Sequence, residues 1–293
     1  MYSVSYLILN DSQRFVIVSA HVPYCNQSHA LPLLFERYGL SAAPTHELAQ
    51  MVIDTRFVSG ECIIMKNALR AGYTQDEFLT LINELIREHP HLTVVAFWQR
   101  VMDALRKKAR KTVVADKTPD YGAYMGLLQC LWPDAQFVHL VRNGWATAQS
   151  MVKHPGYREL VRRNRDNWCT LAHGAWQPTQ HPVKEPELTD CLQLWARRLR
   201  KIQSESTQLA EANYLEFRYE DLLRQPAALM EAMAKGLGLS ASPEWLEHCV
   251  SQVDSGALTR LEALQYSEQS LVTSNPASLE LMRHYGYLES VTG

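Results

Sequence analysis

The chain has 293 residues, of which 46% are hydrophobic and 9% aromatic, a composition typical of a globular protein with a full core. Lys and Arg number 29 against 31 Asp and Glu, and this near balance argues against a general nucleic-acid-binding protein. The six cysteines are scattered without a C-x-x-C motif, which indicates reduced thiols rather than a disulfide framework.

The first residues, M-Y-S-V-S-Y-L-I-L-N-D, have no basic region and too short an apolar run for a signal peptide. No stretch of the sequence approaches the length of a membrane span. Together with the cysteine pattern, these features predict a cytoplasmic protein without a membrane partner.

Strand-like and helix-like segments alternate along the chain, which predicts an α/β fold with a mostly parallel central sheet flanked by helices. The expected strands are residues 15–20, 112–115, 137–141 and 214–217. The expected helices are residues 29–38, 42–52, 74–89, 94–111 and 188–212, with others starting near Trp145 and at Pro226.

Residues 155–186 depart from this alternation, because they are rich in Arg, His, Pro and Gln and lack a clear period. Long segments of this kind are usually lids or binding loops, so we expect an acceptor-gating lid or insertion here. The sequence has no convincing domain boundary elsewhere, and we predict that residues 1–293 form a single domain.

One strand end carries the pattern of an anion site. The apolar run at residues 137–141 ends at Arg142, and Ser150 follows eight residues later, about two turns into the next predicted helix. An Arg at a strand's carboxyl end and a Ser on the following helix can converge on one anion, in the crevice where open α/β sheets bind ligands. A guanidinium suits a phosphate because its planar fork bonds two oxygens at once.

Two segments resemble a known family. Lys117-Thr118-Pro119 and residues 133–150 resemble the 3′-phosphate-binding segment of sulfotransferases that use 3′-phosphoadenosine 5′-phosphosulfate, and residues 214–226 resemble the family's strand followed by Y-E-D-L and a Pro. The resemblance implies the sulfotransferase fold, which is related to P-loop nucleotide hydrolases, and that nucleotide as co-substrate. It also implies that Arg142 and Ser150 hold the 3′-phosphate and that Tyr219 lies by the adenine.

The segment around Lys117 would carry the transfer chemistry. In the family a Lys at this position stabilises charge on the leaving oxygen, and the resemblance gives that role to Lys117. One branch of the family has a His base where this chain has Pro119, and another has a Glu base at the position of Asp116. Asp116 is therefore a candidate base, or instead a cap of the turn that follows its strand.

The donor loop departs from the family pattern, in which a Gly- and Ser/Thr-rich loop with a Lys or Arg cradles the 5′-phosphosulfate. Residues 19–29 contain no Gly, Lys or Arg, and Pro23 removes one amide donor. Asn26 and Ser28 are candidate helix caps that would face an anion, and His21 is a candidate titratable group or base.

The resemblance thus predicts an enzyme that transfers a sulfuryl group to a hydroxyl or amine of a small-molecule acceptor. The alternative is a protein of the same fold that binds a nucleotide or another anionic ligand without transfer. No metal is expected, because the histidines lack the spacing of a zinc site. A homodimer is compatible with the sequence.

Overall fold

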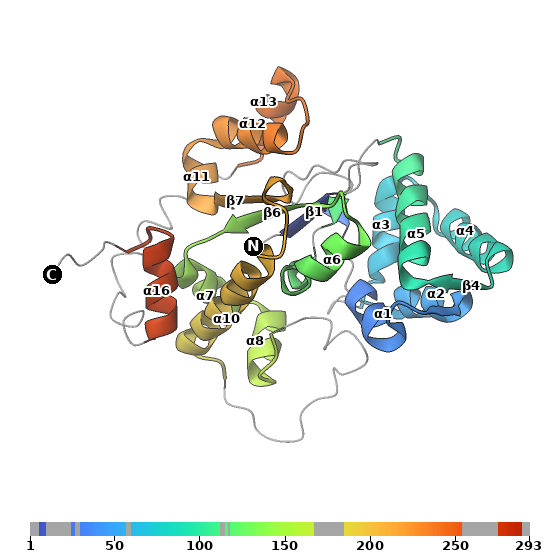
Figure 1. Ribbon diagram of the computed structural model, residues 1–293, viewed down its shortest axis with the longest axis horizontal. Coiled ribbons are helices and arrows are strands. Elements are labelled where there is room, and N and C mark those ends of the chain that lie inside the picture. The colour runs from blue at the N-terminus through green and yellow to red at the C-terminus, as the bar shows by residue number, and fades with distance from the viewer. Residues whose placement is uncertain are drawn as a thin grey trace. The chain divides into compact units, whose positions relative to one another are not determined.

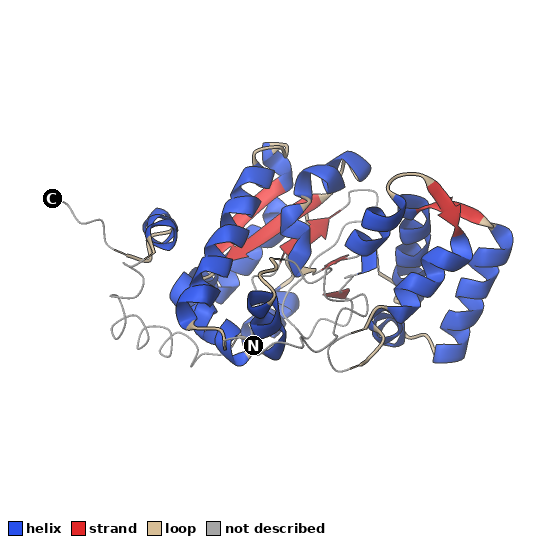
Figure 2. Cartoon of the chain, turned by 90° about the horizontal axis from the view of Figure 1, so that it is seen from below, coloured by secondary structure: helices blue, strands red, loops and turns tan. Residues whose placement is uncertain are grey.

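The computed structural model describes residues 6–9, 25–26, 30–56, 60–111, 115–116, 118–166, 185–253 and 275–288. The contacts of these residues divide into two compact units, an N-terminal unit up to residue 137 and a C-terminal unit from residue 138 onward. Both units combine helices with short strands (Figures 1 and 2), which confirms the predicted α/β class. The single-domain prediction stays a prediction.

The N-terminal unit consists of a helical cluster and five short strands among its described residues. Its elements are β1 (Tyr6–Leu9), β2 (Cys25–Asn26), α1 (Ala30–Tyr38), β3 (Ala42–Pro44), α2 (Thr45–Asp54), α3 (Ile63–Ala71), α4 (Gln75–Glu88), β4 (His91–Thr93), α5 (Val94–Lys108), β5 (Ala115–Asp116), the 3-10 helix η1 (Pro119–Ala123) and α6 (Met125–Leu131). Helices α1 to α5 pack on one another, β2 pairs in parallel with β5, and β1 pairs with β5 in the antiparallel sense.

The helices of this unit begin where the sequence provides caps. Thr74 and Glu77 form a capping box at the start of α4, and the Thr93 hydroxyl accepts the backbone N–H of Ala96 at the start of α5. Phe78 and Ile82, one turn apart on α4, are buried. These features confirm the helices predicted at residues 29–38, 74–89 and 94–111, whereas α3 was not predicted.

The helix predicted at residues 42–52 is wrong at its start. Residues Ala42 to Pro44 form β3, which pairs with β4, and α2 begins only at Thr45. Pro44 is extended, with a ψ of 123°, and the Thr45 N–H bonds the carbonyl of Pro90 instead of a helical partner. The β3–β4 pairing therefore takes the backbone groups that a longer helix would have used.

The C-terminal unit contains the strand end that carries the predicted anion site. Its elements are β6 (Gln136–Val141), α7 (Gly144–Lys153), α8 (Pro155–Arg162), α10 (Leu188–Ser206), the 3-10 helix η2 (Glu211–Asn213), β7 (Tyr214–Arg218), α11 (Tyr219–Arg224), α12 (Pro226–Gly236), α13 (Pro243–Ser251) and α16 (Pro276–His284). Strands β6 and β7 are neighbours, and α7, α8 and α16 pack against α10.

Helix α10 supplies the core of this unit. The side chains of Leu192, Trp195, Leu199 and Ile202 are all buried, as their helical spacing predicts. The helix ends at Ser206, six residues before the predicted end at Ala212, and η2 follows it.

In the first part of the segment at residues 155–186 the expected lack of regular structure is wrong, because Pro155–Arg162 forms the helix α8, and the lid itself stays a prediction. The His154 side chain caps this helix by accepting the N–H groups of Gly156 and Tyr157 through Nδ1, and Pro155 occupies the first turn. Residues 167–184 lie outside the described residues. So does the predicted strand at 15–20, and of the predicted strand at 112–115 only Ala115 is described, in β5.

Candidate functional site

The junction of β6 and α7 is built as a strand that stops sharply at a capped helix. Asn143 is the N-cap of α7, and its Oδ1 accepts the Ala146 N–H at 3.1 Å. Gly144 lies directly against α10, since a Cβ added there would meet the Trp195 ring at 2.6 Å. No larger residue fits at this position without displacing the indole, so the turn is fixed by packing as well as by its cap.

Arg142 lies at the end of β6, half-buried, with its guanidinium carbon 5.0 Å from the centre of the Tyr219 ring. Burial lowers the pKa of Arg142, and the neighbouring Tyr219, Glu220 and Tyr287 act in the opposite direction. The guanidinium stays charged, because arginine does not lose its proton in proteins. A permanent positive charge is thus held at the strand end, over an aromatic face.

Three buried N–H groups at this junction have no hydrogen-bond partner within the part of the chain that the structure describes. They are Nε of Arg142, Nδ2 of Asn143 and Nε1 of Trp145. Buried donors are almost always bonded in native proteins, so several unbonded ones within four residues call for an explanation. An acceptor-rich ligand at the strand end, such as a phosphate, fits this arrangement.

Tyr219 and Glu220 reach this junction from the start of α11, directly after β7. The Glu220 carboxylate is 1% exposed, and it accepts the Asn143 N–H at 3.0 Å and the Tyr287 hydroxyl at 2.8 Å. The structure therefore brings the predicted residues Arg142 and Tyr219 together, and it adds Glu220 to them.

Ser150 lies on α7, as predicted, and is half-buried. Its hydroxyl donates to the Ala146 carbonyl at 3.1 Å, one turn earlier in the same helix. Bonding of this kind is common for a Ser inside a helix. For Ser150 to donate to a ligand, the hydroxyl must turn away from that carbonyl.

Asp116 ends β5 in the N-terminal unit, and its carboxylate is 7% exposed. It accepts the Thr118 hydroxyl at 2.8 Å and the Tyr121 hydroxyl at 3.0 Å. The pairing of β2 with β5 places Asn26 beside Asp116 in the backbone register. Lys117, His21 and Ser28 lie outside the described residues.

His139 is a packed residue of β6. Its side chain is fully buried, with Nδ1 at 2.8 Å from the Tyr214 hydroxyl and 2.9 Å from a Glu216 oxygen. Burial of Glu216 raises its pKa, but hydrogen bonds and charge from His139, together with the hydroxyls of Tyr214 and Tyr285, outweigh this and leave the pKa lowered.

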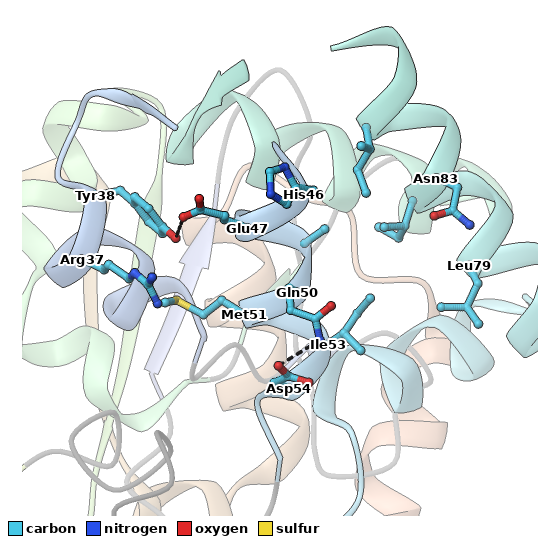
Figure 3. A pocket seen from close by; sticks show the side chains of 13 residues that line it. Arg37, Tyr38, His46, Glu47, Gln50, Met51, Ile53, Asp54, Leu79 and Asn83 are labelled. Carbon is cyan, nitrogen blue, oxygen red and sulfur yellow. Dashed lines mark hydrogen bonds between the residues drawn. The ribbon is translucent and has the colours of Figure 1, made fainter. Parts of the chain in front are cut away.

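Two pockets lie within the N-terminal unit. One, of about 390 Å³, lies among α1, α2 and α4. Figure 3 shows two hydrogen-bonded pairs among its side chains, in which Tyr38 donates to Glu47 at 2.7 Å and Gln50 donates to Asp54 at 3.0 Å. None of the predicted site residues lines this pocket. Because the predicted site residues lie elsewhere, we do not assign the candidate site to this pocket.

The second pocket, of about 370 Å³, lies between α1 and the η1–α6 segment. Its walls are largely apolar and include Leu31, Phe35 and Leu128, with Leu127 at the surface. Tyr121, which also lines it, is the residue that bonds Asp116. This pocket therefore adjoins the β5 end, where the sequence predicts the transfer chemistry.

Among the described residues no helix is both long and apolar enough to cross a membrane. Within the same residues no group of three His, Cys, Asp or Glu side chains is placed to hold a metal ion.

Residues 59–243, more than half of the chain, match the sequence model of the sulfotransferase family. The chain belongs to the sulfotransferase family. It is 23% identical over 180 residues to omega-hydroxy-beta-dihydromenaquinone-9 sulfotransferase Stf3 of Mycobacterium bovis and of Mycobacterium tuberculosis. The match covers 61% of this chain and 42% of the length of those relatives.

Solved structures that share the fold include two sulfotransferase domains. The sulfotransferase domain from the curacin biosynthetic pathway aligns with a TM-score of 0.58 at 15% identity, over 92% of both chains. The sulfotransferase domain from the Synechococcus PCC 7002 olefin synthase aligns with a TM-score of 0.54 at 15% identity, over 92% of this chain and 88% of that one. At this identity the likeness establishes the fold alone.

Sequence reasoning did not find Glu220, Tyr287 and Met282, which contact the β6–α7 junction. Glu220 is the Glu of the quoted Y-E-D-L segment, so the segment was noticed without a role for this residue. Tyr287 lies close to the end of the sequence, far from any segment that was singled out. A Glu directly after Tyr219 is the one signal that the sequence offered.

Proposed function

We propose that this sulfotransferase-family chain transfers a sulfuryl group from 3′-phosphoadenosine 5′-phosphosulfate to a hydroxyl group of a small-molecule acceptor. The observation that carries the proposal is the β6–α7 junction, where a charged Arg142 lies over Tyr219 with unbonded buried donors beside it. Family membership supports the reaction class, and the junction supports a doubly charged phosphate ligand.

The nucleotide would be held in the C-terminal unit by the 3′-phosphate and the adenine. Arg142 would bond the phosphate through its planar fork, and Nδ2 of Asn143 is a second donor at the same strand end. Ser150 would contribute its hydroxyl after turning from the Ala146 carbonyl. Tyr219 has one face toward the guanidinium, and we assign its remaining surface to the adenine.

When bound, the nucleotide supplies the activated sulfuryl group and a phosphate leaving group. The protein's part is to stabilise charge on the leaving oxygen and to take the acceptor's proton. We assign the first role to the ammonium group of Lys117. For the second role Asp116 and His21 are the candidates, and the two hydroxyls that already bond the Asp116 carboxylate favour a role in fixing the loop.

The acceptor we propose is an alcohol with a largely apolar body. Two observations support this class. The apolar pocket between α1 and α6 adjoins the β5 end and is large enough for several methylene groups or a ring. The mycobacterial relatives act, by name, on an omega-hydroxy menaquinone, which is an apolar alcohol. We also propose that the chain works in the cytoplasm, where its free thiols would stay reduced.

The test is a transfer assay with the sulfuryl donor and a panel of alcohols graded from short polar diols to long-chain and isoprenoid alcohols. We expect sulfated product from the apolar members, with a KM that falls as the chain lengthens. Leu127→Asp, which places a charge on the exposed edge of the pocket wall, should raise the KM for long alcohols, while Leu69→Asp, on exposed surface away from the pocket, serves as a control. Turnover of polar acceptors alone would overturn the acceptor class.

A further inference from the structure

The backbone of the turn between β6 and α7 is held by side chains that come from distant parts of the chain. The Val141 carbonyl accepts the Tyr287 hydroxyl at 3.3 Å, and the Asn143 N–H donates to Glu220 at 3.0 Å. The Gly144 N–H donates to the sulfur of Met282 at 3.2 Å, a weaker contact. These contacts cover three of the four consecutive residues 141–144.

Their placement around Arg142 is specific. The Val141 carbonyl belongs to the peptide unit that precedes the Arg142 Cα, and the Asn143 N–H belongs to the unit that follows it. Both units are therefore restrained, which restricts the two backbone dihedral angles of Arg142 and with them the direction of its Cα–Cβ bond. Glu220 and Tyr287 act as one group here, because the single proton of the Tyr287 hydroxyl is shared between Glu220 at 2.8 Å, the stronger contact, and the Val141 carbonyl at 3.3 Å.

Tyr287 reaches the turn because of the way α16 ends. Gly286 has a φ of +66°, and the N–H groups of Gly286 and Tyr287 bond the carbonyls of Arg283 and Met282. This is the Schellman arrangement, which reverses the chain after a helix. The Arg218 guanidinium carbon lies 4.7 Å from the centre of the Tyr287 ring, so the ring is held in place from β7 as well.

The chemistry of the pair suits a permanent clamp. Burial, and then the Glu220 charge, raise the pKa of Tyr287, so its hydroxyl remains a donor over the whole range of working pH. The Glu220 carboxylate would repel an approaching phosphate, but its oxygens already accept a backbone N–H and a phenol hydroxyl and are hidden from solvent.

We propose that Tyr287 and Glu220 are positioning residues that hold the Arg142 backbone so that its guanidinium meets the 3′-phosphate of the nucleotide. The inference rests on the proposed nucleotide site and adds to it a role for the segment of residues 275–288. This role in ligand recognition is distinct from the packing of α16 against α10.

The test compares calorimetric titrations with 3′-phosphoadenosine 5′-phosphate and with AMP, which lacks the 3′-phosphate. Tyr287→Phe removes the hydroxyl that bonds Val141 and Glu220. Tyr285→Phe is the matched control, because Tyr285 is equally buried, lies two residues away, and donates to Glu216 rather than to the turn. The same measurements are made in the Arg142→Ala background.

We expect Tyr287→Phe to weaken binding of 3′-phosphoadenosine 5′-phosphate roughly three- to tenfold while AMP binding is unchanged. Tyr285→Phe should lower the melting temperature and leave the ratio of the two affinities alone. In the Arg142→Ala background the effect of Tyr287→Phe on that ratio should vanish, because the clamp acts through Arg142.

Two outcomes would overturn the proposal, and they differ in what else they overturn. If Arg142→Ala lowers the affinity ratio but folded Tyr287→Phe does not, the clamp is wrong and the nucleotide site stands. If the parent protein binds both ligands equally, the nucleotide site and the clamp are both wrong. Should Tyr287→Phe fail to fold, Glu220→Gln, which weakens the other end of the contact, provides the same comparison.

Discussion

Arg142 follows β6 and Asp116 ends β5, and the surroundings of these two charged side chains differ. Asp116 accepts two buried hydroxyls at 2.8 Å and 3.0 Å, so its charge is engaged within the protein. Arg142 has its Nε buried without a hydrogen-bond partner among the described residues and touches mainly an aromatic ring. A charged side chain with a structural role is hydrogen-bonded within the protein. A charged side chain that binds a ligand is held in position but keeps donors that the protein does not bond.

The largest effect we expect comes from Arg142→Ala. Binding of 3′-phosphoadenosine 5′-phosphate should weaken by about 2 kcal/mol or more, roughly thirtyfold, because a phosphate loses a charged bidentate partner. The free energy of unfolding should change less, by about 1 kcal/mol, since the contact with the Tyr219 ring is lost but Nε has no hydrogen-bond partner among the described residues. Calorimetric titration and urea denaturation measure the two quantities, with Arg197→Ala on exposed surface as the control. Unchanged binding would show that the ligand site lies elsewhere.

Asp116→Ala should give the opposite pattern. Removing the carboxylate takes an acceptor from the buried hydroxyls of Thr118 and Tyr121, which should lower the free energy of unfolding by about 2 kcal/mol. Asp116→Asn, which keeps one acceptor oxygen, should lose about half as much. Denaturation midpoints and kcat are measured on the same samples. A steep fall in kcat for Asp116→Asn at unchanged stability would instead identify Asp116 as the base.

Gly144→Ala tests how rigidly the β6 end is packed. The new Cβ would lie 2.6 Å from the fully buried Trp195 ring, which has no space to withdraw, so we expect a loss of about 1–2 kcal/mol of stability. Gly236→Ala is the control, since its Cβ would meet the movable Leu215 side chain at 2.7 Å. Thermal unfolding of the two variants should separate them. Equal melting temperatures would mean that the turn can shift.

The smallest effect we expect is the loss of free energy of unfolding at acid pH that comes from Glu216, which bonds His139 of β6. The pKa of Glu216 is lowered in the folded protein, so the stability it contributes is present above its unfolded pKa and is lost as pH falls through the folded value. The parent should therefore lose more free energy of unfolding than Glu216→Gln between about pH 5 and about pH 3. Denaturant titrations across that range measure it, and parallel curves for the two proteins would refute the assignment.

The sequence predicted the strands and helices around the site better than it predicted the contacts between residues of the site. An apolar run ending at Arg142-Asn143-Gly144 gave the strand, the turn and the start of α7, because β-branched residues and a helix cap act locally. The same local reasoning missed β3, since its strand conformation depends on pairing with β4. It also missed α8, whose start depends on the cap that His154 provides.

For the candidate site, too, the sequence indicated single residues and the structure showed their contacts. Family resemblance singled out Arg142 and Tyr219 from separate segments, and the fold places the guanidinium over the ring. The sequence allowed Asp116 to be either a general base or a cap of the turn after its strand. The two hydroxyls that bond its carboxylate favour the structural role. Lys117 and His21 lie outside the described residues, so their roles stay predictions.

The sequence by itself determined that this is an α/β protein with an Arg at a strand end and a capped helix behind it, because periodicity, caps and turn residues act over a few positions. Only the tertiary structure decided what holds that Arg in place. Glu220 lies 77 residues from Asn143, and Tyr287 lies 146 residues from Val141. Contacts over such separations depend on how the whole unit packs, and no local pattern in the chain encodes them.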